Sequence, residues 1–152
     1  MNKYRDRASF GRRQEYRVIA ELLRLNFDVY STLVDDQGID CVIRLDPNRY
    51  LDIQIKARSD EAQEWNLFAA MSIKPRDNFF FIFYMEKNDT MWVVPSTDVV
   101  SMASRNVEGK NAGKYSLSLP KTEDAPKWAI YAKYKAPEGF SLLREYGASG
   151  AA

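Results

Sequence analysis

The sequence predicts one globular α/β domain, in which an amphipathic helix precedes a series of β-strands and further helices follow. A chain of 152 residues with 45% hydrophobic and 13% aromatic residues is long and apolar enough to bury a single core. Apolar residues recur at helical spacing over residues 9–26, and alternation with period two predicts a hairpin over residues 39–56. We assign residues 1–146 to this domain and residues 147–152 to a flexible tail of small residues.

The remaining elements follow in chain order. Ser9 is placed to cap the first helix, and a short strand over residues 27–30 comes after it. The continuous apolar run over residues 79–85 is typical of a strand buried on both faces. The later part of the chain predicts a strand over 90–95, a helix over 96–105, an edge strand over 115–119, an element of either type over 127–134 and a closing helix over 138–146.

The composition excludes several kinds of catalytic site. The chain has no histidine, which removes Ser-His-Asp triads and the usual His-containing zinc sites. The single cysteine, Cys41, cannot form an intramolecular disulfide, fits a reducing compartment and falls on the apolar side of its strand, where we expect it to pack in the core. No N-terminal apolar run suits a signal peptide or a membrane span, so we expect a cytoplasmic protein with no membrane partner.

Basic residues gather near the N-terminus, although the formal net charge of the whole chain is only +1. Six of the first 17 residues are basic and two are acidic; the basic ones are Lys3, Arg5, Arg7, Arg12, Arg13 and Arg17. A local patch of this kind can contact phosphates, and it can equally be a solvated helix face. Farther along, Lys110 lies within a predicted loop over residues 106–113 and Lys114 follows it, and both are available to phosphate.

The predicted hairpin presents a row of polar side chains on one face. In its second strand, apolar residues alternate with Asp52, Gln54 and Lys56, and Asp40 lies in the first strand, over residues 39–45. Two or three carboxylate or carbonyl oxygens can hold Mg²⁺, and a nearby lysine can orient the attacking water. The combination favours metal-dependent phosphodiester cleavage, and the alternative is a solvated face with alternating charges.

Two further acids come close to this row in the predicted arrangement. Glu15 borders the buried stripe of the first helix, so its carboxylate needs a partner. That partner is either Arg12 or Lys56 in a salt bridge, or the metal site itself. Asp36 lies four residues before Asp40 and either contacts the metal or forms a turn.

The order of these motifs resembles the PD-(D/E)XK nuclease superfamily, the restriction-endonuclease-like fold. The order consists of a helix with Glu15, a strand, Asp40 and the tripeptide Gln54-Ile55-Lys56. Residues 11–15 (GRRQE) and 26–30 (NFDVY) look like the archaeal Holliday-junction resolvase branch, while residues 36–40 with 54–56 look like uncharacterised bacterial domains of the same superfamily. The resemblance covers residues 9–57 by motif, and it implies a mixed central β-sheet flanked by helices.

The resemblance also implies roles for individual residues. Asp40 corresponds to the principal metal ligand, Gln54 to the second motif position, Lys56 to the catalytic lysine and Glu15 to a ligand or orienting acid. Two positions depart from the family's pattern, because Ile39 replaces the usual proline and Gln54 replaces the usual acid. An amide in place of a carboxylate should weaken binding of a divalent cation.

The leading prediction is therefore a nuclease that hydrolyses DNA with Mg²⁺ or Mn²⁺. The predicted metal ligands are Glu15, Asp36, Asp40 and Gln54, and the predicted phosphate contacts are Lys3, Arg7, Arg12 and Arg13. One alternative is an inactive nucleic-acid-binding module that keeps the fold. Another is a protein-interaction subunit of a restriction or toxin–antitoxin system. A homodimer would suit an enzyme that cuts both strands of a duplex.

Overall fold

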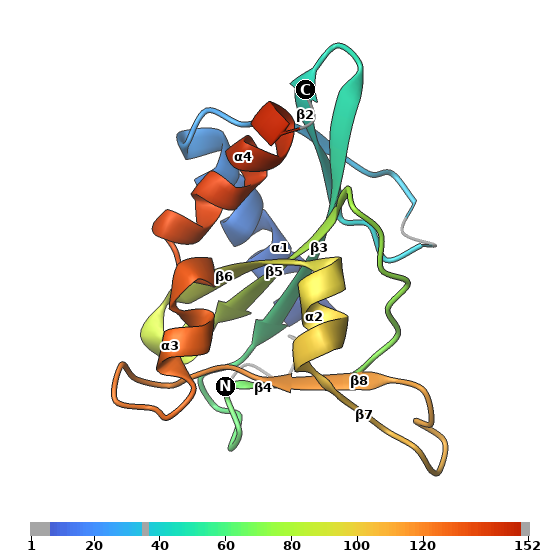
Figure 1. Cartoon of the computed structure of the whole chain (residues 1–152), viewed down its shortest axis with the longest axis vertical. Helices are drawn as coiled ribbons and strands as arrows, with labels where there is room; N and C mark the ends of the chain where they lie inside the picture. Colours follow the sequence, from blue (N-terminus) through green and yellow to red (C-terminus); the bar gives the residue numbers. More distant parts are fainter. Residues whose placement is uncertain (1–6, 35–36, 150–152) are drawn as a thin grey trace.

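A computed structural model describes residues 7–34 and 37–149, and it contains a five-stranded mixed sheet with helices on both sides (Figure 1). The helices of this part of the chain are α1 (Arg7–Arg24), α2 (Ser96–Met102), α3 (Trp128–Tyr131) and α4 (Ser141–Ser149), with 3-10 turns η1 (Glu86–Asn88), η2 (Ala132–Tyr134) and η3 (Glu138–Phe140). The strands are β1 (Asp28–Ser31), β2 (Cys41–Asp46), β3 (Arg49–Arg58), β4 (Leu67–Met71), β5 (Phe79–Met85), β6 (Thr90–Pro95), β7 (Ser104–Arg105) and β8 (Tyr115–Ser118).

The central sheet has the strand order β1-β2-β3-β5-β6. Its neighbouring strands are antiparallel except β3 and β5, which run parallel and place Gln54 beside Phe81 and Lys56 beside Phe83. The chain between β3 and β5 passes through β4, which joins β8 and β7 in a separate three-stranded sheet. The mixed central sheet flanked by helices, expected from the sequence, is confirmed.

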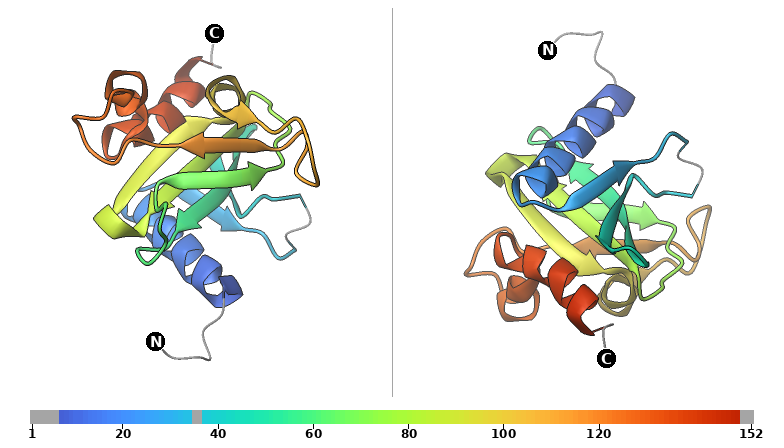
Figure 2. Two further views of the ribbon diagram at one scale, coloured as in Figure 1. Left: turned by 90° about the horizontal axis from the view of Figure 1, so that it is seen from below. Right: turned by 90° about the horizontal axis from the view of Figure 1, so that it is seen from above.

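Hydrophobic clusters cover both faces of the central sheet. On one face, Leu22 of α1 and Leu143 of α4 pack with Ile53 of β3. On the other face, Phe83 of β5 packs with Phe68 of β4 and with residues of β8, α2 and α3. Figure 2 shows β4 and β8 lying across the central sheet on the side opposite α1. The structure therefore has three layers. Helices α1 and α4 form the first layer, the central sheet forms the second, and the smaller sheet with α2 and α3 forms the third.

The predicted elements are mostly confirmed, with corrections at particular ends. The predicted hairpin is formed by β2 and β3 over residues 41–58, although Ile39 and Asp40, predicted to lie in its first strand, precede β2. β5 is buried along its whole length as predicted. Ser9 lies inside α1 instead of capping it. The helix predicted to reach residue 105 ends at Met102, because the chain then pairs with β8 as β7. The predicted edge strand, β8, is the middle strand of its sheet, since both β4 and β7 bond to it.

The C-terminal helix, α4, begins and ends three residues later than the predicted helix over residues 138–146. Residues 147–149 of the predicted tail belong to this helix, and residues 138–140 of the predicted helix form the 3-10 turn η3. Residues 150–152 of the predicted tail lie outside the described residues. Within residues 7–34 and 37–149, none of the helices combines the length and the apolar character needed to cross a bilayer.

Candidate active site

The central feature of the candidate site is the place where β2 ends while β3 continues. The last pair of their ladder joins Cys41 and Ile53, and β3 then runs on to Arg58 beside β5 alone. The Asp40 N–H donates to the Ile53 carbonyl oxygen at 2.9 Å, and the Asp40 carboxylate accepts a hydrogen bond from the Ile55 N–H at 2.6 Å. The carboxylate thus takes the place of a missing strand partner, and the main chain fixes its position.

Gln54 and Lys56 share one face of β3, and the register of Cys41 with Ile53 brings the preceding Asp40 next to Gln54. Strand alternation places Gln54 and Lys56 on this face because Ile53 and Ile55 are buried on the opposite face. A Cβ atom added to Gly38 would lie 3.1 Å from the Gln54 Nε2, so the Gln54 side chain packs against the turn that precedes Asp40. That turn needs glycine, since Gly38 has a φ of +71°. Among the described residues, no hydrogen bond or ion pair engages the side chain of Gln54 or Lys56.

Glu15 belongs to α1, which packs on the face of the sheet that carries Ile53 and Ile55, opposite the face of Gln54 and Lys56. Its carboxylate forms an ion pair with Arg12 at 3.1 Å and is 21% exposed, which confirms one of the partners predicted for it. Burial raises the pKa of the Cys41 thiol to about 12, and the negative charges of Asp40 and Glu15 add to the rise. The two carboxylates therefore act on the same buried thiol, one from the helix and one from the sheet. Cys41 is fully buried, as predicted.

A polar contact that the sequence analysis missed lies next to Glu15. Gln14 is only 9% exposed and donates its side-chain N–H to the Glu86 Oε2 at 2.7 Å. Burial and the negative charge of Asp60 raise the pKa of Glu86. The contact joins α1 to the end of β5. Helical spacing could have indicated it, because Gln14 stands four residues before the buried Val18 and so belongs to the same stripe.

The other predicted site residues are either exposed on α1 or not described by the structure. Arg12 and Arg13 are exposed on α1 and available to solvent. Lys3 and Asp36 lie outside the described residues, and the structure describes the backbone of Arg7 but not its side chain. Across residues 7–34 and 37–149, no three or more histidine, cysteine, aspartate or glutamate side chains are grouped so that they could hold a metal ion.

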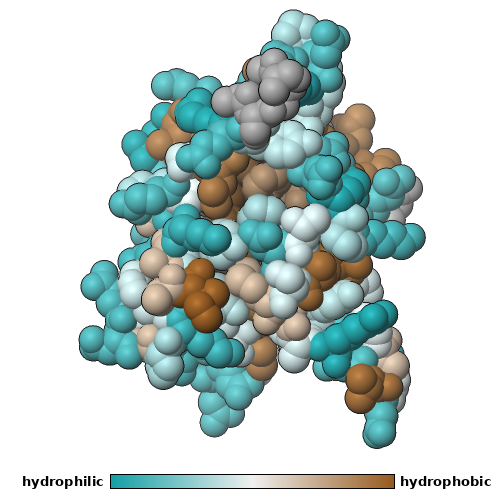
Figure 3. All heavy atoms as spheres, viewed as in Figure 1, coloured by the Kyte–Doolittle hydropathy of each residue, from teal (hydrophilic) through white to brown (hydrophobic). Residues whose placement is uncertain are grey.

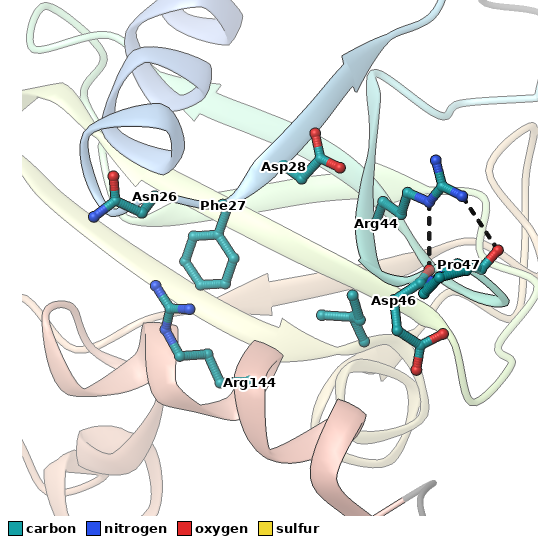
Figure 4. A pocket seen from close by; sticks show the side chains of 8 residues that line it. Asn26, Phe27, Asp28, Arg44, Asp46, Pro47 and Arg144 are labelled. Carbon is teal, nitrogen blue, oxygen red and sulfur yellow. Dashed lines mark hydrogen bonds between the residues drawn. The ribbon is translucent and has the colours of Figure 1, made fainter.

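A pocket of about 420 Å³ lies near the turn of the β2–β3 hairpin, away from Asp40. Figure 4 shows Phe27 and Arg144 on one side of it and Arg44 with Pro47 on the other. The guanidinium of Arg44 donates to the carbonyl oxygens of Asp46 and Pro47, and that of Arg144 donates to the carbonyl oxygen of Leu25. Both cations are thus bonded to the chain itself, and the pocket is separate from the polar row.

The fold is shared with a solved nuclease. No family model and no curated protein matches the sequence. Among solved structures, the chain is similar to the bacterial homing endonuclease I-Ssp6803I, with a TM-score of 0.71, 18% sequence identity and 96% of each chain covered. At this level of identity the likeness shows the fold, so the chain has the mixed sheet flanked by helices that this endonuclease has.

Proposed function

We propose that the protein is a metal-dependent nuclease of the PD-(D/E)XK kind that hydrolyses phosphodiester bonds in DNA. The observation that carries the proposal is the Asp40 carboxylate, held by the Ile55 N–H at 2.6 Å where β2 leaves β3, with Gln54 and Lys56 flanking Ile55 on the same strand. The shared fold with a homing endonuclease supports the same function. A fold by itself does not specify function, so the proposal depends on the site.

The donor set fits a hard divalent cation. Asp40 and Glu15 supply carboxylate oxygens, and Gln54 supplies an amide oxygen. Mg²⁺ in nucleotide-processing sites is commonly held by one or two carboxylates, several waters and the substrate phosphate, so a cluster of three acids is not needed. When bound, such an ion would stabilise negative charge on the phosphate and lower the pKa of a coordinated water.

Lys56 supplies a positive charge for the same chemistry. No ion pair among the described residues engages its ammonium group, which can therefore donate to the attacking water and to a phosphate oxygen. Arg12 and Arg13 are exposed on α1, near Glu15, and can contact the flanking phosphates. In this proposal the chain's own residues would supply metal ligands, a water-orienting cation and phosphate contacts.

Cleavage of supercoiled plasmid DNA in Mg²⁺ or Mn²⁺ tests the proposal. Asp40→Asn keeps an oxygen that can accept from Ile55 but removes the charge, and Lys56→Ala removes the ammonium group. Each should lower the cleavage rate by roughly 10²-fold or more while DNA binding persists. Lys127→Ala, an exposed residue beside α3, is the control and should cleave at the wild-type rate. Wild-type cleavage by both site variants would reject the proposed mechanism.

A second candidate function is a DNA-binding module that no longer cleaves. Gln54 favours it, because an amide binds a divalent cation more weakly than a carboxylate does. Calorimetric titration with Mn²⁺ separates the two candidates. Saturable binding that is lost in Asp40→Asn supports the nuclease. Duplex binding without any such Mn²⁺ binding supports the inactive module.

A further inference from the structure

We infer that two basic segments beside the candidate site form a binding surface for the phosphate backbone of double-stranded DNA. The first is the β7–β8 hairpin, residues 104–115, and the second is the β4–β5 loop, residues 72–78. The inference rests on the proposed function in taking DNA as the ligand. It differs from the contacts expected at the N-terminus of α1, because neither segment belongs to that helix.

The β4–β5 loop reaches the polar face of β3, and the hairpin adjoins the other end of that loop. At the end of the β4–β5 loop, the Asp52 N–H donates to the Asn78 carbonyl oxygen at 2.8 Å, two residues before Gln54. In the same loop, the guanidinium of Arg76 forms an ion pair with the Asp52 carboxylate at 2.5 Å. The hairpin joins the loop at its other end, since Tyr115 pairs with Met71. DNA that reaches Gln54 would therefore pass close to both segments.

The two segments concentrate positive charge on a nearly neutral chain. They contain two acids, Asp77 and Glu108, and five cations: Lys74, Arg76, Arg105, Lys110 and Lys114. Among the described residues, Arg76 is the member of this set that takes part in an ion pair, and the other four cations have no acidic partner within salt-bridge distance. Figure 3 shows the hairpin standing out from the surface, with most of its atoms hydrophilic. A polyanion complements such a surface.

Double-stranded DNA fits the surface better than a single strand does. Proteins that bind single strands stack bases on open aromatic faces. Here the guanidinium of Arg76 covers the Phe79 ring at 4.5 Å from its centroid, and that of Arg105 lies 5.6 Å from the centroid of Tyr115. The aromatic faces are occupied, while stacked guanidinium groups keep their in-plane N–H donors for phosphate oxygens. The surface therefore offers contacts to the backbone and none of the stacking positions that unpaired bases use.

The salt dependence of DNA binding tests this inference. A triple variant, Arg105→Gln with Lys110→Gln and Lys114→Gln, is compared with a charge-matched control, Lys121→Gln with Lys127→Gln and Lys133→Gln, whose residues are exposed elsewhere. Anisotropy of a labelled duplex is followed across salt concentrations in EDTA, so that no cleavage occurs. The hairpin variant should bind on the order of 10²-fold more weakly near 0.1 M salt, with a log–log slope reduced by roughly 2 to 3. The control should keep the wild-type affinity and slope.

The outcomes are separable from those of the cleavage test. An unchanged slope in the hairpin variant, or an equal loss in the control, overturns the inference. Equal affinity for a single strand of the same sequence overturns its assignment to duplex DNA. Lys110→Gln alone changes one exposed side chain of the hairpin turn, so it should not disturb folding. It should lower the slope of log affinity against log salt concentration by about 1. A wild-type protein that binds duplex but never cuts would reject the nuclease and leave this inference standing.

Discussion

β3 and β5 lie side by side in register, yet they differ in what covers them. Every residue of β5 is buried, whereas buried and partly exposed residues alternate along most of β3. The second hydrophobic cluster includes Phe81 and Phe83 of β5, but their register partners on β3 are Gln54 and Lys56. The layer made by β4, β8, α2 and α3 therefore covers β5 completely and leaves polar positions of β3 accessible.

This difference indicates why the candidate site lies on β3. A polar side chain on β5 would be buried without water, which costs several kcal/mol unless it finds a partner. On β3 the same face is partly exposed, and the end of β2 leaves room for the Asp40 carboxylate beside Ile55. The position of the site thus follows from where two neighbouring elements end.

The largest expected effect comes from substitutions at one register pair of these strands. Phe83→Ala should lower the free energy of unfolding by roughly 3–5 kcal/mol, because it leaves a cavity in a fully buried position. Lys56→Ala, at the partner position on β3, should change the free energy of unfolding by less than about 0.5 kcal/mol. The same variant should still lower the cleavage rate by roughly 10²-fold or more. Denaturant unfolding followed by circular dichroism measures both free energies. A large stability loss in Lys56→Ala would show that β3 is as dependent on packing as β5.

The second prediction concerns the free edge of β3 beyond β2. Asp40→Ala removes the acceptor of the Ile55 N–H and should destabilise the fold by roughly 1–3 kcal/mol. Asp40→Asn should cost less, because its amide oxygen can accept the same hydrogen bond. Asp52→Ala, which removes a carboxylate from β3 itself, is the matched control, since its ion pair with Arg76 is partly exposed and should contribute about 1 kcal/mol or less. Equal losses in Asp40→Ala and Asp40→Asn would contradict this role of the hydrogen bond.

Local sequence patterns predicted β5 and the β2–β3 hairpin well, and long-range contacts poorly. Seven consecutive apolar residues indicate β5, and alternation assigns Gln54 and Lys56 to one face, because both patterns depend only on neighbouring residues. The Gln14–Glu86 hydrogen bond joins residues 72 positions apart, and no local period encodes such a pairing. The pairing of β8 with β4 was missed for the same reason. The roles of Glu15, Asp40, Gln54 and Lys56 in catalysis stay predictions.

The third prediction tests whether the turn before Asp40 positions the polar row of β3. Gly38→Ala should destabilise the protein by about 1–2 kcal/mol, because its φ of +71° disfavours a side chain. Gly109→Ala has the same backbone cost at a φ of +78° but meets no atom within 4 Å. Only Gly38→Ala brings a Cβ within 3.1 Å of the Gln54 Nε2, so only this variant should bind Mn²⁺ more weakly in calorimetry. Equal Mn²⁺ affinities would show that the turn does not position Gln54.

The smallest expected effect lies at the end of β5, where its buried run gives way to a polar residue. Burial and the charge of Asp60 raise the pKa of Glu86 above its ordinary value of 4.5, while Arg13 opposes the rise and Gln14 donates to the same carboxylate. A carboxyl group whose pKa is higher in the folded state binds more protons there, so its contribution to stability falls as pH rises above 4.5. Glu86→Gln has no carboxyl group to titrate, so its stability should not fall in this way, and its amide oxygen can still accept the hydrogen bond from Gln14. Relative to the wild type, the free energy of unfolding of the variant should therefore rise by roughly 0.5 kcal/mol between pH 4 and pH 7, a size typical of partly exposed charges. Thermal unfolding at the two pH values measures this change. If the difference in the free energy of unfolding between variant and wild type stays constant with pH, Glu86 has the same pKa in the folded and unfolded chains. The end of β5 would then be as open to water as the polar face of β3.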